Sequence, residues 1–357
     1  MTMNSIFTKY LFYSLFSLSI IVFGCSGESE VIDDPRPSFF STLSDIDDLT
    51  ITIETDYNLL LQNKEVEDNI YQDAQLTAQS NQGDPLNVAV QIRSRGVTRK
   101  SLCDFPPIMI KIQKEERSQL DVKKTDNLKL VSFCKDDPGF QNLVAKEYLI
   151  YKLYNVLTDT SYNVKLANLN VKDTIGTVYV ADQIAFLIEP TDDMASRLGC
   201  TYNEEDVSPV KRIHKEQYKN FVVFQYMVGN TDWNLSGRHN IRMLDCNSEL
   251  GPKPVPYDFD YSGLVNATYA KPHPMLPIKK VTERLFQFRG SVQEDFSKTY
   301  ALFNAKKSTF YSTVQDFPYL DEDTKLNMIA YLDAFYENIS SDETMMAEMM
   351  KVRKKKS

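Results

Sequence analysis

A loop rich in aspartate, asparagine and histidine carries side chains that could catalyse a group transfer. It runs from Gly229 to Asn240, between an apolar stretch at 221–228 and a short strand-like run at 241–244. Aspartate and asparagine are common in turns, where they cap or close the backbone. The chemical alternative is that Asp232 orients or deprotonates a hydroxyl group while Asn240 binds a metal ion.

Two more carboxylates follow within the same short hairpin. Asp258 and Asp260 stand two positions apart, directly after an apolar strand-like run. Alternate residues of an extended chain point to one side, so these carboxylates repel each other. A divalent cation beside them removes the repulsion, whereas the plainer alternative is a turn with solvated acids. We expect a metal site made of Asn240, Asp258 and Asp260.

Lys111 and Glu147 form a third candidate group. Lys111 lies within the strand-like run 108–112, where a solvent-facing lysine is also common, and Glu147 lies on the apolar face of a helix expected at 140–157. A buried carboxylate needs a partner. Lys111 is the natural one, although another basic residue or water at a helix end would also serve. A strand lysine paired with a helix glutamate, ahead of a catalytic Asp232 and a metal-binding aspartate, is the residue set of a protein-kinase-like phosphotransferase.

The elements that must position these residues can be read from hydrophobic periodicity and from glycine and proline breaks. Strands are expected at 49–54, 86–93, 108–112, 128–133, 162–171, 178–188, 241–244 and 255–259, and helices at 140–157, 211–228, 277–289 and 321–350. This order predicts an α+β protein with a cleft between two lobes. The lobes would be a β-rich N-terminal lobe at 41–189 and a helical C-terminal lobe at 190–350.

The N-terminus has the pattern of a secretory leader. Lys9 precedes an apolar run at 10–23, and residues 1–24 end in a Val-Phe-Gly sequence before Cys25 that resembles a bacterial lipobox. A plain transmembrane anchor is the alternative, although the run is short for a span. The acidic residues after Cys25 resemble the surface-export signal of Bacteroidetes lipoproteins. We expect lipidation at Cys25, a tether at 25–40, and an outer-membrane lipoprotein on the cell surface or the periplasmic face.

Four further cysteines fit an exported protein with disulfides. They allow three pairings, of which we favour Cys103 with Cys134, because each borders an expected strand of the same half. Cys200 would then pair with Cys246. Unpaired buried thiols are the alternative, and a zinc site is disfavoured because the chain has no C-x-x-C spacing.

Composition narrows the classes of function. The 40 basic and 49 acidic residues give a formal net charge of −9, which argues against a nucleic-acid partner. Three histidines are too few for a histidine-rich metal site. No G-x-S-x-G motif is present, which argues against a hydrolase of the serine-nucleophile type.

The order of the motifs resembles the CotH-type (spore coat protein H-like) family of atypical kinases, and most closely a group of uncharacterised bacterial lipoproteins. The resemblance covers about residues 86–290. It is carried by five blocks: 92–96, 105–111, 128–134 leading into 141–157, 229–240, and 254–260.

The resemblance implies a protein-kinase-like fold that binds ATP and Mg²⁺. Lys111, positioned by Glu147, would hold the nucleotide phosphates, with Arg93 and Arg95 assisting or merely forming a charged strand face. Asp232 would be the catalytic aspartate.

The resemblance also makes Asn240, Asp258 and Asp260 the magnesium ligands. The sequence departs from the kinase pattern at two points. No G-x-G-x-x-G occurs in the first lobe, and Asn240 lies eight residues after Asp232 where kinases place a metal-binding asparagine at five. The expected activity is transfer of a phosphoryl or nucleotidyl group to a protein or glycan hydroxyl. The alternative is a catalytically inactive scaffold that binds a ligand or partner at the envelope.

Overall fold

The structure is a computed structural model, which describes residues 34–64, 70–81, 83–96, 98–125, 127–202, 212–246 and 249–351. The expected leader at 1–24, Cys25 and most of the tether lie outside these ranges. Residues from Pro35 onward form one compact unit. Within the described ranges, no helix combines the length and the apolar character needed to cross a membrane.

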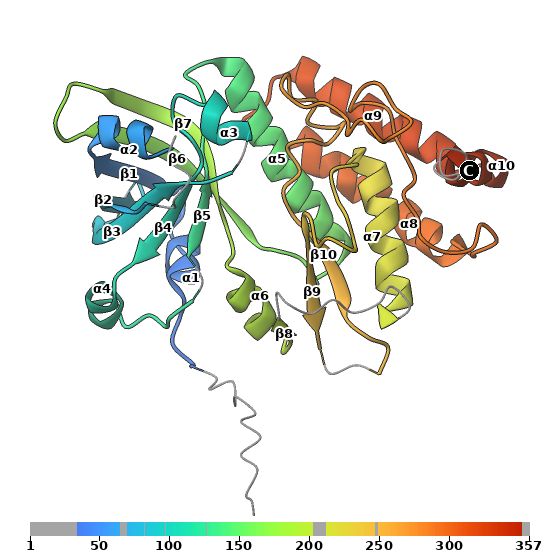
Figure 1. Cartoon of the computed structure of the whole chain (residues 1–357), viewed down its shortest axis with the longest axis horizontal. Coiled ribbons are helices and arrows are strands. Elements are labelled where there is room, and N and C mark those ends of the chain that lie inside the picture. The colour runs from blue at the N-terminus through green and yellow to red at the C-terminus, as the bar shows by residue number, and fades with distance from the viewer. Residues whose placement is uncertain are drawn as a thin grey trace, which may run out of the picture. The chain divides into compact units, whose positions relative to one another are not determined.

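Seven strands of the first half close into a barrel (Figure 1). They are β1 (Thr50–Thr55), β2 (Gln72–Gln79), β3 (Leu86–Ser94), β4 (Ile108–Ile112), β5 (Leu128–Val131), β6 (Val164–Asp173) and β7 (Tyr179–Ile188). Their order is β1-β2-β3-β4-β5-β7-β6, and a parallel pairing of β1 with β6, in which Thr50 lies opposite Asn168, closes the ring. The other neighbouring strands in the ring pair antiparallel.

Strand alternation fills the barrel. Ile51 and Ile53 of β1 and Val88 and Val90 of β3 are almost completely buried in one cluster, while the residues between them are more exposed. Side chains of a strand alternate between faces, so each strand sends one apolar set into the barrel. Burying a valine or isoleucine side chain contributes about 1.5–3 kcal/mol, which makes this set the main support of the barrel.

The remaining elements are short helices around the barrel and a second, largely helical layer. They are α1 (Phe39–Ser44), α2 (Tyr57–Lys64), α3 (Thr98–Leu102), α4 (Lys114–Gln119), α5 (Pro138–Leu157), α6 (Thr191–Arg197), β8 (Thr201–Tyr202), α7 (Lys215–Val228), β9 (Ile241–Asp245), β10 (Lys253–Pro256), α8 (Ser297–Gln315), α9 (Glu322–Ile339) and α10 (Asp342–Lys351). Strands β10, β9 and β8 form a small antiparallel sheet.

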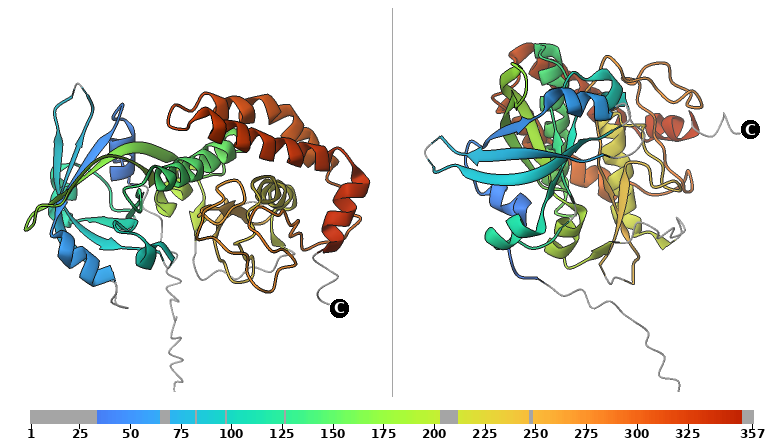
Figure 2. Two further views of the ribbon diagram at one scale, coloured as in Figure 1. Left: turned by 90° about the horizontal axis from the view of Figure 1, so that it is seen from above. Right: turned by 60° about the vertical axis from the view of Figure 1, so that its left-hand side comes forward.

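Helix α5 joins the barrel to the second layer. It begins at Pro138, with the Asp137 side chain accepting a hydrogen bond from the Gly139 N–H at 2.8 Å as an N-cap. It packs against β6 and β7 on one side and α8 on another (Figure 2). The buried face of α5 therefore contributes to the same core as α7, α8 and α9, and Glu147 lies on that buried face.

The expected two-lobed protein-kinase-like fold was wrong. The strands of the first half form a closed barrel, and the residues from Pro35 onward cluster as one compact unit. Alternating strands signal a sheet with one buried face, but they do not reveal that its two edge strands pair with each other. The pairing of β1 with β6 joins segments more than a hundred residues apart, and no local pattern encodes it.

The helix expected at 277–289 was also wrong, because this segment is irregular. Its apolar spacing suited a helix, but tertiary contacts override it. The Arg284 side chain donates hydrogen bonds to the carbonyl oxygens of Tyr226 and Met227, at the C-terminal end of α7, and to that of Tyr331. These bonds tie the segment to α7 and α9, which fixes it in an irregular course in place of the expected helix.

Two disulfides are formed, Cys103–Cys134 and Cys200–Cys246, which are the pairs that the sequence favoured. The first bridge joins the end of α3 to the segment after β5. Cys103 lies one helical turn from Arg99, whose carbonyl accepts the Cys103 N–H at 3.0 Å. The bridge therefore ties the short helix that carries Arg99 to the barrel.

We expect loss of the Cys103–Cys134 bridge to lower the free energy of unfolding by about 2–5 kcal/mol, because it closes a loop in the unfolded chain. The bridged residues are 31 positions apart. The measurement is thermal unfolding of a Cys103→Ser/Cys134→Ser variant beside the parent chain, both without reductant. A Cys200→Ser/Cys246→Ser variant, melted under the same conditions, shows how much the other bridge contributes. Equal melting temperatures for the parent and the first variant would contradict the expectation.

Candidate functional site

The loop after α7 starts at a position that only glycine fits. Gly229 ends the helix with φ +66°, and a Cβ there would collide with the Tyr331 hydroxyl. The loop is then held from inside, because the Trp233 ring donates from Nε1 to the Asn230 carbonyl at 3.2 Å and packs edge-on against Phe221. Asp232 therefore lies in a loop whose backbone is held rigidly.

Asp232 has an oriented carboxylate that stays accessible. Its Oδ1 lies 3.2 Å from His239 Nε2, and its Oδ2 accepts a hydrogen bond from Asn240 Nδ2 at 3.1 Å. The same amide donates to the Asp232 carbonyl at 2.7 Å. The Asp232 side chain is 38% exposed. A fixed yet solvent-accessible carboxylate is suited to accept a proton from a bound hydroxyl group.

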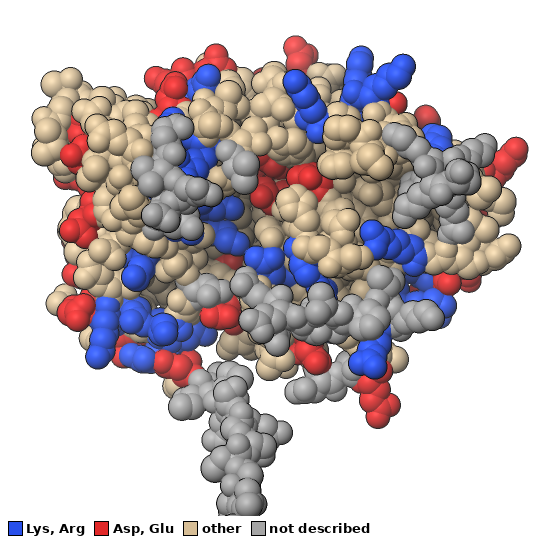
Figure 3. Space-filling model, viewed as in Figure 1, with Lys and Arg blue, Asp and Glu red and all other residues tan. Residues whose placement is uncertain are grey.

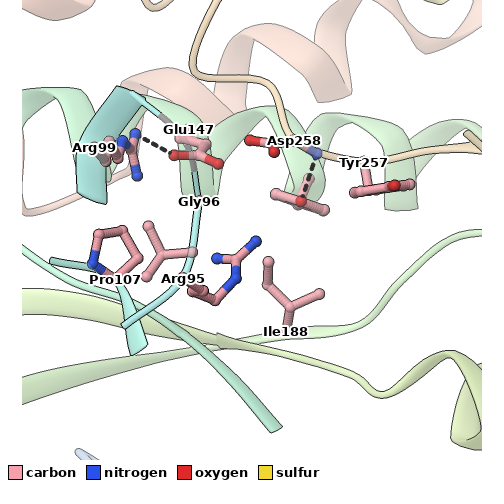
Figure 4. A pocket seen from close by; sticks show the side chains of 10 residues that line it. Arg95, Gly96, Arg99, Pro107, Glu147, Ile188, Tyr257 and Asp258 are labelled. Carbon is pink, nitrogen blue, oxygen red and sulfur yellow. Dashed lines mark hydrogen bonds and ion pairs between the residues drawn. The ribbon is translucent and has the colours of Figure 1, made fainter. Parts of the chain in front are cut away.

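Asp258 is placed beside this loop by the backbone. The Tyr257 N–H donates to the Asn240 carbonyl at 3.2 Å, which brings the two segments together. Asp258 itself has φ +63°, and its N–H donates to the Tyr151 hydroxyl at 2.9 Å (Figure 4). A left-handed conformation is uncommon at residues other than glycine, although aspartate and asparagine adopt it more readily than most.

Behind Asp258, one arginine is shared by two buried carboxylates. Arg99 Nη2 lies 2.6 Å from Glu147 Oε2, and Arg99 Nε lies 3.3 Å from Asp260 Oδ2. The Tyr269 hydroxyl donates to Asp260 Oδ2 at 3.0 Å and accepts from Arg99 Nε at 2.8 Å. The three charged residues are all under a tenth exposed. This network fixes α3, α5 and the segment after Asp258 against one another.

The network is short of positive charge. Burial raises the pKa of Glu147 and of Asp260 above their usual ranges, and the Arg99 guanidinium opposes the shift in both. The negative charge of Asp258 raises both further. Burial alone lowers the pKa of Arg99, but the two carboxylates hold it well above its usual range. An additional cation next to Asp258 would therefore relieve repulsion among the carboxylates.

A small cavity of about 40 Å³ opens at this point (Figure 4). Arg95 and Gly96 line one side, and Glu147, Tyr257 and Asp258 line the other. Gly96 has φ +86°, a conformation that glycine adopts without strain. The volume suits a group the size of a phosphate, and it is far below the roughly 300–1,000 Å³ of a pocket that encloses a whole small molecule.

Further basic side chains surround Tyr257. The Lys129 ammonium lies 5.1 Å from the centre of the Tyr257 ring, and the Arg242 guanidinium carbon lies 4.6 Å from it. Arg242 also donates to the Tyr257 hydroxyl at 2.6 Å. Lys129 and Arg242 therefore lie around Tyr257, and Arg95 shares the small cavity with Asp258, so the site combines positive charge with carboxylates.

The predicted pairing of Lys111 with Glu147 was wrong, because Arg99 is the partner of Glu147. On β4, Ile108 and Ile110 point into the barrel, so Lys111, the residue after Ile110, points outward and is exposed. Its ammonium lies 5.4 Å from the centre of the Tyr71 ring, and the Arg93 guanidinium carbon lies 5.4 Å from the same ring. Neither residue lines the small cavity, whereas the predicted Arg95 does.

The expected metal ligands are only partly available. Asp260 is engaged by Arg99 and Tyr269, which leaves Asn240 and Asp258. Within the described ranges, no three or more histidine, cysteine, aspartate or glutamate side chains are grouped to hold a metal ion. Magnesium bound together with phosphates needs only one or two carboxylates from the protein. The donor set fits that kind of site and does not fit a cage made of protein ligands alone.

Arg99, Lys129 and Tyr151 were not predicted. Arg99 lies in a five-residue helix after Gly96, too short to show a periodic pattern. Lys129 alternates with the buried Leu128 and Leu130 of β5, so its outward direction could be read from the sequence, but its approach to Tyr257 depends on the tertiary fold. Tyr151 stands one helical turn after Glu147 on the same buried face, and this spacing could have been read from the sequence.

Comparisons with known proteins add little. No family model matches the chain, and no curated protein matches it. Among solved structures, the chain is similar to a Helicobacter pylori proinflammatory kinase, CtkA, with 9% sequence identity and a TM-score of 0.35. The match covers 73% of this chain and 95% of that chain. A likeness this low establishes neither fold nor function.

Proposed function

We propose that the chain binds the phosphates of a nucleoside triphosphate together with Mg²⁺ and transfers a phosphoryl or nucleotidyl group to a hydroxyl of a protein or glycan. This is an atypical kinase activity of the CotH type. The observation that carries the proposal is that one short loop and the next segment bring Asp232, Asn240 and Asp258 together, and that Asp258 shares a small cavity with Arg95. Positioning and charge neutralisation supply most of the rate in phosphoryl transfer.

Each residue has a role that follows from its contacts. Asn240 and Asp258 would hold Mg²⁺, which neutralises charge on the phosphates when it is bound. Arg95, which lines the small cavity, and Lys129, which lies against the Tyr257 ring, would contact phosphate oxygens. Asp232 would take the proton of the acceptor hydroxyl. Because the cavity holds no more than a phosphate, the nucleoside would lie outside it.

The proposed location is the outer membrane, with the chain anchored through lipidated Cys25 and facing the cell surface or the periplasm. Its partners there would be a nucleotide and a protein or glycan of the envelope. The support is the lipobox-like sequence before Cys25 and the two disulfides, which are typical of exported proteins.

We expect ATP with Mg²⁺ to raise the melting temperature of the chain, and the effect to need both components. A ligand at a hundred times its Kd adds about 2.7 kcal/mol to the stability of the state that binds it. The measurement is a thermal-shift titration with ATP, with Mg²⁺, and with both. In Asp258→Asn the joint effect is expected to disappear, because the carboxylate that binds the cation is lost.

The matched control is Asp84→Asn, which removes one exposed carboxylate that does not line the small cavity. It should keep the full shift. An equal shift in Asp258→Asn, or a shift by ATP that ignores Mg²⁺, would refute the proposed metal site.

A binding scaffold without catalysis is the second candidate function. Two observations favour it: the network with Arg99 and Tyr269 occupies Asp260, and the cavity is small. A scaffold would show the thermal shift but would transfer label neither from ATP labelled at the γ-phosphate, which reports phosphoryl transfer, nor from ATP labelled at the α-phosphate, which reports nucleotidyl transfer. That outcome separates the two functions in the same preparation.

A further inference from the structure

Two adjoining cavities at the other end of β4 and β5 are lined by an excess of basic side chains. The smaller, of about 100 Å³, is bordered by Lys111, Arg117, Lys123 and Lys124, and none of the described residues that line it is acidic. The larger, of about 450 Å³, shares Phe40 and Lys123 with it. We call them the basic cavities. No residue lines both the smaller one and the candidate site.

The positive charge of the smaller cavity is mostly uncompensated. Lys123 lies 3.3 Å from Asp193, but Lys111, Arg117 and Lys124 have no carboxylate partner among the described residues. The Nε of Arg117 is buried and makes no hydrogen bond to any of the described residues. A buried donor without a partner costs free energy. An anion that accepts its hydrogen bond would recover that cost.

The larger cavity adds basic residues that are better balanced. Arg197 pairs with Glu189 at 2.8 Å, and Lys165 donates to the Ser44 carbonyl at 2.9 Å. Lys152 has no carboxylate partner among the residues described. In Figure 3, Lys and Arg side chains gather at the lower left, over α4 and close to α1. This local excess stands out because the whole chain has a net charge of −9.

The N-terminal segment that leads into the cavities indicates what covers this surface. Helix α1 borders both cavities through Phe40, and it begins only a few residues after Pro35. Residues 26–34 separate Pro35 from Cys25, and ten extended residue steps span at most about 35 Å. With lipid on Cys25, the basic cavities would remain within that reach of the bilayer. A bilayer surface presents many phosphates. It therefore matches a surface with several cations better than a single small anion would.

We infer that the basic cavities are a docking surface for anionic phospholipid headgroups. The smaller cavity takes a headgroup phosphate through Lys111, Arg117 and Lys124, and Lys152 extends the contact. This surface orients the anchored chain on its membrane. The inference uses the proposed anchor at Cys25 but not the proposed transfer activity, because the two sites are separate.

The test is co-sedimentation of residues 35–357 with lipid vesicles. This part contains both cavities and both disulfides in one compact unit, and its cooperative melting is checked first. We expect binding to vesicles of phosphatidylglycerol and phosphatidylcholine, and none to phosphatidylcholine alone. Each basic residue near an anionic surface contributes about 1 kcal/mol. Arg117→Gln/Lys124→Gln should therefore weaken binding roughly tenfold or more.

Lys279→Gln/Lys280→Gln is the matched control, since it removes the same charge from two exposed lysines that line neither cavity. An equal loss in the control pair would overturn the inference, because it would reveal attraction by net charge alone. Absence of binding to anionic vesicles would also overturn it. A thermal shift caused by inorganic phosphate that added anionic vesicles do not reduce would overturn it as well, because the cavity would then be a small-anion site. The ATP shift should be unchanged in both double variants.

Discussion

Replacing Arg99 by methionine is expected to lower the free energy of unfolding by roughly 3–5 kcal/mol. Arg99 is the one charge partner that the described residues offer to the buried side chains of both Glu147 and Asp260. Without it, neither buried carboxylate has an ion-pair partner among the described residues, and Glu147 keeps only the weaker attraction of Arg95 across the small cavity. A loss of this size is a large share of the roughly 5–15 kcal/mol that stabilises a typical domain. Chemical denaturation with circular dichroism measures it.

Two companion variants separate the charge network from simple loss of an arginine. Arg36→Met breaks an exposed pair, 3.7 Å from Asp121, and should cost under about 1 kcal/mol. Arg99→Met/Glu147→Gln/Asp260→Asn removes all three charges and should be more stable than Arg99→Met alone, since no buried carboxylate is left unpaired. If Arg99→Met unfolds like Arg36→Met, the network does not support the fold as described.

Much of the secondary structure could be predicted because burial is periodic. The strands β1, β3, β4 and β7 and the helices α5 and α7 lie within a few residues of the expected ranges. Each has an apolar set on one face, with a spacing of two in strands and between three and four in helices. That local pattern is sufficient to place an element along the chain.

Elements with weak apolar faces were missed. Strand β2 reads Gln-Asp-Ala-Gln-Leu-Thr-Ala-Gln, with only Leu76 and Ala78 as apolar residues that are fully buried. Helix α8 has many polar residues and buries Phe303, Phe310 and Val314 among few others. In both, contacts with the rest of the fold select the element. The same holds for barrel closure, which depends on a pairing between strands far apart in sequence.

The candidate site shows the same division. Asp232 and Asn240 meet because they lie in one short loop that the sequence marks, and the next hairpin brings Asp258 to them. Glu147 was rightly expected to need a partner, but a choice among basic residues requires the tertiary fold. Local chemistry could be anticipated, whereas charge pairing between distant segments could not.

The site and the architecture therefore have to be judged separately. The predicted architecture was wrong, yet Asp232, Asn240, Asp258 and Arg95 still converge on one region. Function depends on the placement of such groups and can occur on unrelated folds. The proposal for phosphoryl transfer accordingly depends on tests of these residues and not on fold likeness.

Asp232→Asn is expected to reduce phosphoryl transfer by about 10²–10⁴-fold while leaving the Mg²⁺-dependent ATP shift in place. The amide keeps nearly the same shape and can still contact His239 and Asn240, but it cannot accept the acceptor's proton. The measurement is release of the labelled γ-phosphate to water, together with self-labelling of the chain. Because the side chain is partly exposed, the melting temperature should change little.

His239→Gln distinguishes a base from a general disturbance of the loop. His239 touches one oxygen of Asp232 and is 58% exposed, so its replacement should only loosen the orientation of the carboxylate and cost far less activity than Asp232→Asn. Equal losses in the two variants would mean that the loop geometry, and not proton acceptance by Asp232, limits transfer. Transfer at the parent rate in Asp232→Asn would exclude Asp232 as the base. If the parent chain shows the ATP shift but transfers nothing, the site at Asp258 binds nucleotide without catalysis. The scaffold function is then the correct one.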